Sequence, residues 1–391
     1  MKIIPFLYLP AIVLLLSGIT GSGDLSGQKR TDQVLWKAGT GSYKNYRIPS
    51  VIVTQKGTIL AFCEGREGGD SGDIDILMKR SENGGKSWSN EMVIWNNGQN
   101  SCGNPCVVED KETGRIWLIM TWNNGKDNET AIISKESIDK RLPYSCYSDN
   151  DGVTWSAPVK MADSCRDSSW GWYATGPGIG IQLVNGKFKG RIIIPANHSY
   201  DDPSGKIREK PFNYGSHVLI SDDHGKTWNM SKPIKPGCNE SQIVELTDGS
   251  LVMNMRSYNN KYCRALSFSR DGGETWSEIQ HEPQLVESLC QASFLSYGLY
   301  KGTGMYLFAN PSVPSGRHHM TIKVSVDECK NWSTSKLVWS GFSAYSCIQK
   351  LPGSNIALFF ECGEKSPYET LRFISFQTRE VFQPGTLISG N

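Results

Sequence analysis

YKNYRIPSVIVTQKGTILAFCEGREGGDSGDIDILMKRSENGGKSW, residues 43–88, contains three short apolar runs separated by turn residues. The runs are Ile48–Val53, Thr58–Cys63 and Ile74–Met78, and each has the length of a strand and is rich in β-branched residues. The stretch closes on a polar turn that ends in Trp88. It therefore predicts one unit of a repeated sheet structure.

The closing turn returns four more times along the chain. The five boxes are Ser81–Trp88, Ser148–Trp155, Ser221–Trp228, Ser269–Trp276 and Ser325–Trp332. We expect the Asp or Asn at the third position of each box to hydrogen-bond turn amides, and the Trp to pack onto its sheet. Five boxes with further chain at both ends predict an all-β fold, a six-bladed propeller of four-stranded antiparallel blades over residues 30–391.

The first residues resemble a secretory signal peptide rather than part of the fold. Lys2 precedes an apolar run, Ile3–Leu16, and small residues follow from Ser17 to Gly23. We therefore expect a signal peptide at residues 1–23 and a secreted, periplasmic or lumenal protein. The alternative is an uncleaved membrane anchor, but the run is shorter than the roughly 20 apolar residues of a spanning helix.

Composition and charge exclude several classes of partner. The 391 residues carry 41 Lys and Arg against 39 Asp and Glu, a net charge of +2, which gives no support for nucleic-acid binding. We also expect no integral membrane span and a monomer. An odd count of 11 cysteines leaves at least one unpaired, although disulfides are possible in an exported protein. Cys102 and Cys106 have no second pair to complete a zinc site, so no metal is expected.

The boxes together with Tyr46-Arg47-Ile48-Pro49 resemble the exo-α-sialidases, or neuraminidases, from about Val34 to Phe382. The resemblance implies a six-bladed propeller that acts on sialylated glycans of glycoproteins, glycolipids or oligosaccharides. It implies no cofactor and no metal.

Sialic acid places particular demands on such a site, because its anomeric carbon carries a carboxylate. Arginine binds a carboxylate with a planar, bidentate fork, which lysine lacks. A carboxylate nucleophile would be repelled by the substrate's own carboxylate, and sialidases instead use tyrosine. The site therefore requires several arginines, a tyrosine with a basic partner, and a separate acid.

The resemblance assigns the arginines by motif. Arg47 lies in the YRIP motif, Arg256 ends the run LVMNMR, and Arg317 precedes the fifth box. These three are expected to bind the substrate carboxylate. Arg66 resembles the family arginine beside the 4-position of the sugar, and Glu361 resembles the carboxylate that orients the first arginine.

Tyr345, in the sequence FSAYS just after the fifth box, matches the family's nucleophile motif. Glu240 is the expected base that accepts its proton. Glu245 competes with Glu240, but it lies within a strand run, where we expect an exposed carboxylate.

The acid must come from a loop that contains several aspartates. Asp75 alternates with Ile74 and Ile76, so we expect it on the outer face of a strand. The family spacing before the first box selects Asp70, and Asp73 remains the alternative.

These residues predict retaining hydrolysis through a tyrosyl intermediate. Trans-sialidase or intramolecular trans-sialidase activity uses the same residues and remains open. A non-catalytic glycan-binding propeller would lack the acid or the nucleophile, and a protein-interaction propeller would lack YRIP. The aromatic group Trp170, Trp172 and Tyr173 fits either packing or stacking on a sugar.

Overall fold

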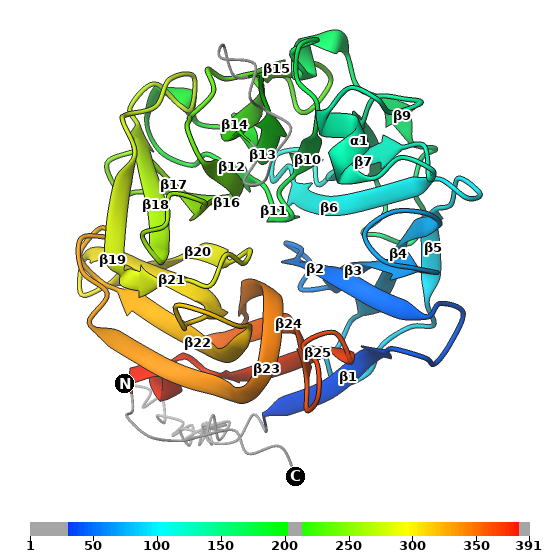
Figure 1. Ribbon diagram of the computed structural model, residues 1–391. Helices are drawn as coiled ribbons and strands as arrows, with labels where there is room; N and C mark the ends of the chain where they lie inside the picture. Colours follow the sequence, from blue (N-terminus) through cyan, green and yellow to red (C-terminus); the bar gives the residue numbers. More distant parts are fainter. Residues whose placement is uncertain (1–29, 202–212, 383–391) are drawn as a thin grey trace, which may run out of the picture.

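A computed structural model describes residues 30–201 and 213–382. Its strands are arranged as a ring of sheets around a central axis (Figure 1). In the described ranges one short α-helix, α1 (Glu129–Ile133), and three 3-10 turns are the only helical elements, so the all-β prediction is confirmed. No helix in these ranges is long and apolar enough to cross a membrane. The predicted signal peptide at residues 1–23 lies outside the described residues.

The largest sheet has nine strands, in the order β2-β3-β4-β6-β7-β8-β9, with β5 on β4 and β11 on β6. Their bounds are β2 Asn45–Val53, β3 Ile59–Arg66, β4 Ile74–Ser81, β5 Met92–Trp95, β6 Ser101–Glu109, β7 Ile116–Asn123, β8 Leu142–Ser148, β9 Val159–Lys160 and β11 Gly178–Ile179. The opening stretch of the sequence analysis forms β2, β3 and β4, which pair antiparallel as predicted.

Two smaller sheets follow along the chain. The five-stranded sheet has the order β10-β13-β14-β15, with β12 also on β13, and the four-stranded sheet has the order β16-β17-β18-β19. Their bounds are β10 Tyr173–Thr175, β12 Ile181–Gln182, β13 Ile192–Ser199, β14 Tyr214–Ser221, β15 Asn229–Met230, β16 Cys238–Glu245, β17 Leu251–Ser257, β18 Cys263–Ser269 and β19 Gln280–Val286.

The last sheet closes the ring. It has seven strands in the order β1-β25-β24-β23-β22-β21-β20. Their bounds are β1 Thr31–Lys37, β20 Ser293–Tyr300, β21 Thr303–Pro311, β22 His318–Ser325, β23 Thr334–Leu351, β24 Asn355–Gly363 and β25 Thr370–Gln377. The antiparallel pairing of β1 with β25 joins the two ends of the described chain (Figure 1).

Each box forms the turn between two paired strands of one sheet, as between β14 and β15 or between β18 and β19. In all five, the third residue accepts the backbone N–H four positions later, which confirms the predicted hydrogen bond. Gly225 of the third box has φ +83°, and a Cβ there would lie 2.3 Å from Trp117 on β7. The same Trp117 packs edge-on against Trp228, the last residue of that box. Glycine is therefore required at this position of the third box, whereas the fifth box has Cys329 there, at φ +61°.

Four inner strands share an interruption near the same end. The pairing register shifts between Arg47 and Ser50 in β2, Gly103 and Cys106 in β6, Cys238 and Ser241 in β16, and Ser343 and Ser346 in β23. Bulges of this kind bend a strand and redirect its side chains. Arg47, Asn104, Glu240 and Tyr345 all lie at these four interruptions.

All 11 cysteines are buried and free. The disulfides that an exported protein could form are therefore not present. The cysteines act as small apolar side chains of the core instead, as with Cys63 and Cys347 in the cluster that also contains Val51 and Phe62.

Candidate active site

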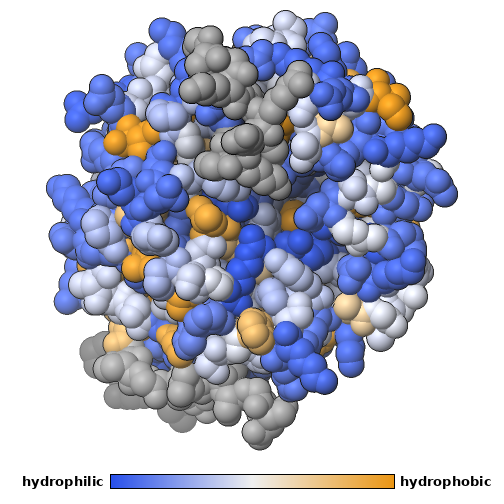
Figure 2. All heavy atoms as spheres, in the orientation of Figure 1, coloured by the Kyte–Doolittle hydropathy of each residue, from blue (hydrophilic) through white to orange (hydrophobic). Residues whose placement is uncertain are grey.

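A pocket of about 310 Å³ opens at the bulged ends of the inner strands. Five arginines and four carboxylates line it: Arg47, Arg66, Arg141, Arg256, Arg317, Glu64, Asp70, Glu129 and Glu240. The face seen in Figure 1 is hollowed near the centre of the ring, and mostly hydrophilic side chains gather around the hollow (Figure 2). The five guanidinium groups in the lining make the pocket suited to an anionic ligand.

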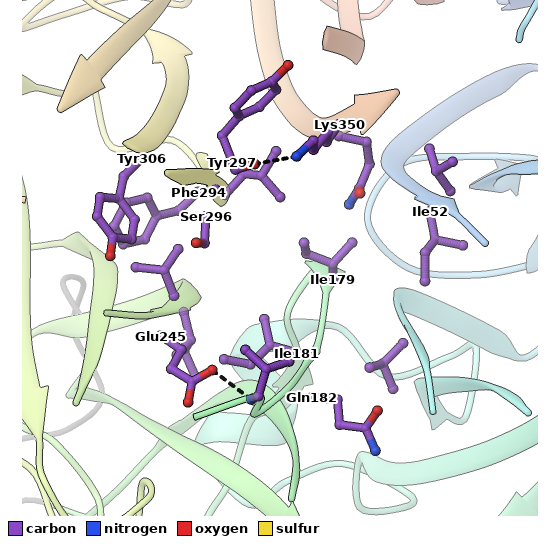
Figure 3. Close-up of a pocket in the computed structure, with 18 of the residues that line it drawn as sticks. Ile52, Ile179, Ile181, Gln182, Glu245, Phe294, Ser296, Tyr297, Tyr306 and Lys350 are labelled. Carbon is purple, nitrogen blue, oxygen red and sulfur yellow. Dashed lines mark hydrogen bonds between the residues drawn. The ribbon is translucent and has the colours of Figure 1, made fainter. Parts of the chain in front are cut away.

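A second cavity, of about 810 Å³, lies at the other ends of the same inner strands (Figure 3). Its lining is largely apolar and contains no arginine. Glu245 accepts the backbone N–H groups of Val184 and Asn185, at 2.8 and 2.9 Å, and Lys350 donates to the carbonyl of Tyr297. These two charged side chains are thus engaged by the protein itself, and the smaller, charged pocket is the candidate site.

Arg47 is fixed by a buried carboxylate from the other end of the chain. Glu361 on β24 is fully buried and accepts from Arg47 Nε at 2.7 Å and Nη2 at 3.3 Å. The same carboxylate also accepts the backbone N–H groups of Ile48 and Tyr345, at 2.9 and 3.0 Å. Glu361 therefore holds both Arg47 and the backbone that carries Tyr345.

Tyr345, Glu240 and Arg256 form one hydrogen-bonded group. The Tyr345 hydroxyl donates to Glu240 Oε1. Arg256 Nη1 donates to Glu240 Oε2 at 2.8 Å and to the Tyr345 hydroxyl at 3.4 Å. Arg256 Nε is buried and has no hydrogen-bond partner among the described residues.

The phenol of Tyr345 is neutral at physiological pH in the unliganded protein. Burial and the charge of Glu240 raise its pKa well above the usual value, while Arg256 and Arg317 act in the opposite direction. Loss of this proton would therefore require an acceptor close to the hydroxyl. The direct contact between Tyr345 and Glu240 provides one.

Arg317 contacts neutral groups. Its Nη1 donates to the Tyr368 hydroxyl at 2.7 Å and its Nη2 to the carbonyl of Leu289 at 3.3 Å. Its guanidinium carbon lies 5.5 Å from the centre of the Tyr345 ring. The structure thus brings Arg47, Arg256 and Arg317 around the same tyrosine.

Asp70 lies at the mouth of the pocket with an 85% exposed side chain. Its carboxylate pairs with Arg66 Nη1 at 2.5 Å and with Arg47 Nη1 at 3.6 Å. Desolvation by the surrounding residues raises the pKa of this carboxyl, but the charges of Arg66 and Arg47 outweigh it and the pKa is lowered overall. Asp70 is therefore ionised in the unliganded protein. Arg47 is shared between Asp70 and Glu361.

Three further pocket residues were absent from the sequence prediction. Glu64 accepts from Arg66 Nε at 2.7 Å and from the backbone N–H of Asn104 at 2.6 Å. Arg141 donates from Nη2 to the Asn104 side chain and, at 2.7 Å, to the Thr121 hydroxyl. Since residues two apart share one face of a strand, the pairing of Glu64 with Arg66 was open to prediction. Asn104 and Arg141 carried no such signal.

The aromatic group of the sequence analysis divides into two kinds of residue. Trp172 lines the pocket, and the Arg141 guanidinium lies over its ring at 4.3 Å. Trp170 and Tyr173 are buried, and Trp170 stacks on His198 at 3.6 Å. Asn197, also in the lining, is fully buried, and neither its Oδ1 nor its Nδ2 has a hydrogen-bond partner in the described part of the chain. An orphaned amide in a pocket wall is available to a ligand group that both donates and accepts.

Two expectations about carboxylates are wrong. Asp75 does not lie on an exposed face: it is buried and accepts from the Tyr43 hydroxyl and from Asn96 Nδ2, both at 2.6 Å. Glu245 is likewise buried, because it binds two backbone N–H groups at the second cavity. Asp73, the alternative acid, is not among the residues that line the charged pocket.

Residues 57–358 match the family described as BNR repeat-like domain. The chain is 30% identical to the sialidase of Bacteroides fragilis over 346 residues, 83% of this chain and 61% of that protein. It is 32% identical to the sialidase of Clostridium perfringens over 308 residues, 73% of this chain and 74% of that protein. Among solved structures, the Hadza microbial sialidase Hz136 has a TM-score of 0.75 at 27% identity, covering 86% of this chain and 66% of that one. The fold is thus that of the sialidase propellers, whereas the chain spans only about three fifths of the length of the Bacteroides relative.

Proposed function

Because this chain belongs to the sialidase family, we propose that it is a retaining exo-α-sialidase that releases terminal sialic acid from glycoconjugates through a tyrosyl intermediate. One observation carries the proposal. Arg47, Arg256 and Arg317 line one pocket around Tyr345, whose hydroxyl contacts Glu240. Three guanidinium groups beside a phenol and its base fit a substrate whose carboxylate is attached to the reacting carbon.

The chemistry divides into two displacements at the anomeric carbon. In the first, Tyr345 passes its proton to Glu240 and its oxygen bonds to that carbon, while the glycosidic bond breaks and Asp70 protonates the leaving oxygen. In the second, Asp70 takes a proton from a water molecule that attacks the same carbon. The bond to Tyr345 then breaks, and the phenol regains its proton from Glu240. Two inversions give retention.

We also infer that the ring consists of six four-stranded blades, although two of the hydrogen-bonded sheets, of seven and nine strands, are each much larger than a single blade. The 18-residue strand β23 pairs with β22 through its first half and with β24 through its second, so the seven-stranded sheet divides at β23. The nine-stranded sheet is joined at the boundary by a single β4–β6 pair, Ile74 with Ser101. These features support six blades with two shared boundaries.

The decisive experiment is incubation of the purified protein with sialyllactose, followed by mass and anomeric NMR analysis of the released sugar. Release of free sialic acid, initially as the α-anomer, is expected. A β-anomer as the first product would contradict the retaining mechanism. An anhydro sugar or a sialylated acceptor would instead establish transfer, and binding without any product would establish a lectin.

Asp70→Ala should lower the activity on natural substrates more than the activity on substrates with a good leaving group. A sialoside with a sugar leaving group needs protonation, so we expect its kcat/KM to fall by about 10²-fold or more. An aryl sialoside with a good leaving group needs little protonation and should lose less than about tenfold. Measuring both substrates with one enzyme preparation provides the comparison. Equal losses would remove Asp70 from the role of acid.

Substrate binding should raise the pKa of Asp70 and take up a proton. In the unliganded protein Arg66 and Arg47 lower that pKa, so the carboxyl is ionised. A bound carboxylate competes for Arg47 and adds negative charge nearby, and both effects favour the protonated acid. Calorimetric titration with a 2,3-didehydro sialic acid, in buffers of different ionisation enthalpy at mildly acidic pH, should show proton uptake. Asp70→Asn should abolish the uptake, and an unchanged uptake would contradict the assignment.

A further inference from the structure

Arg317 is held in a different way from the other two arginines that surround Tyr345. Arg47 pairs with Glu361 and Arg256 pairs with Glu240, each through a carboxylate. In the described parts of the chain no carboxylate forms an ion pair with Arg317. Its hydrogen-bond partners are one phenol, that of Tyr368, and one backbone carbonyl. The position of this guanidinium therefore depends on Tyr368.

The same tyrosine also contacts Arg47. The guanidinium carbon of Arg47 lies 4.0 Å from the centre of the Tyr368 ring, within the range of a favourable cation–π contact. The hydroxyl of that ring meanwhile accepts from Arg317 at 2.7 Å. One rigid side chain thus touches two arginines, one through its face and the other through its oxygen.

The loop that carries Tyr368 is itself fixed. Tyr368 lies between β24 and β25 and packs against a small apolar cluster that contains Ile48 and Tyr345. The carboxylate of Glu369 accepts three backbone N–H groups of this loop, from residues 364, 365 and 366, at 2.7–3.1 Å. Such a loop keeps the phenol in place without the help of a ligand.

We propose that Tyr368 is a positioning residue that sets the spacing of Arg47 and Arg317, so that both guanidinium groups reach one substrate carboxylate. The inference rests on the proposed function, since it requires an anionic sugar in this pocket. A phenol suits the task better than a carboxylate would. It fixes Arg317 by a hydrogen bond but leaves the charge of Arg317 uncompensated for the substrate.

The two contacts can be removed separately. Tyr368→Phe keeps the ring over Arg47 and removes the acceptor of Arg317, so KM for sialyllactose should rise about tenfold with a smaller change in kcat. Tyr368→Leu removes both contacts and should raise KM by about 10²-fold. The matched control is Tyr147→Phe, because the Tyr147 ring lies 3.9 Å from the Arg115 guanidinium outside the pocket. This control should behave as the wild type.

A binding measurement separates positioning from general damage. The wild type should bind 2,3-didehydro sialic acid far better than its methyl ester, which lacks the charge. The Tyr368 variants should lose affinity for the acid about tenfold or more and keep the weak affinity for the ester. Equal losses for both ligands, or no loss for the acid, would overturn the inference. If the wild type binds neither ligand and releases no sialic acid, the proposed function itself fails.

Discussion

Tyr345→Phe should lower kcat/KM for sialyllactose by on the order of 10³-fold or more, the scale on which loss of a nucleophile acts. The variant removes the one oxygen that contacts Glu240 Oε1 and that lies 3.4 Å from Arg256 Nη1. It retains the ring, which packs against Ile48 and Ala344. The pocket should therefore keep its shape, and the affinity for 2,3-didehydro sialic acid should change little.

A covalent trap tests the same residue directly. With a 2,3-difluorinated sialic acid, fluoride should leave the anomeric carbon and the Tyr345 oxygen should bond to it, with its proton passing to Glu240. The second fluorine should slow the attack of water. Mass spectrometry should then find the added sugar on the tryptic peptide 337–350, which contains Tyr345. The control Tyr147→Phe, outside the pocket, should be modified as the wild type. A sugar attached to any other residue, or a fully active Tyr345→Phe variant, would refute the nucleophile assignment.

The parts of the fold that follow from local rules were predictable from sequence. Each box specifies its own turn, because the third residue and the N–H four positions later are close in sequence. The stretch from Tyr43 to Trp88 specifies three strands by their apolar runs and intervening turns. The register shifts in the inner strands could not be predicted, because they depend on pairings with other strands and not on the local pattern.

The two carboxylates that were wrongly expected to be exposed show when the alternation of side chains along a strand fails to predict exposure. Asp75 does alternate with Ile74 and Ile76, but β4 is covered on both faces. Tyr43 and Asn96 lie on the outer face of this strand and donate the hydrogen bonds that the buried carboxylate of Asp75 requires. Strand alternation predicts a solvent-exposed face only when nothing packs on that face.

The site residues fall into those that carry a motif and those that support them. Arg47 and Tyr345 lie in recognisable sequences, and the structure brings both to one pocket with Arg256. Arg141 follows a lysine and resembles a surface residue, yet it is buried among neutral acceptors. Tyr368 lies in a polar loop with no pattern to mark it. Such residues act through distant contacts, so only the folded chain reveals them.

Arg256→Ala should reduce kcat/KM for sialosides by about 10³-fold, because truncating one member of a buried, hydrogen-bonded charge pair costs several kcal/mol. Two separate losses contribute. On the proposed function, the substrate carboxylate would lose one guanidinium donor. In addition, Glu240 loses its only arginine partner among the described residues. Arg256 also lowers the pKa of Tyr345, so its removal makes the phenol harder to ionise.

Arg256→Lys distinguishes charge from geometry. Lysine restores the positive charge, but its ammonium cannot donate to Glu240 and to a bound carboxylate through one planar fork. We therefore expect an intermediate activity, on the order of tenfold to 10²-fold below the wild type, and chiefly an increase in KM.

Arg115→Ala is the matched control, because Arg115 forms a two-point pair with Asp149, at 2.7 and 2.9 Å, outside the pocket. Exposed pairs of this kind contribute little, so its activity should equal that of the wild type. If Arg256→Lys were as active as the wild type, the planar fork would be unnecessary. If Arg256→Ala lost less than about tenfold, the carboxylate would have to be bound elsewhere.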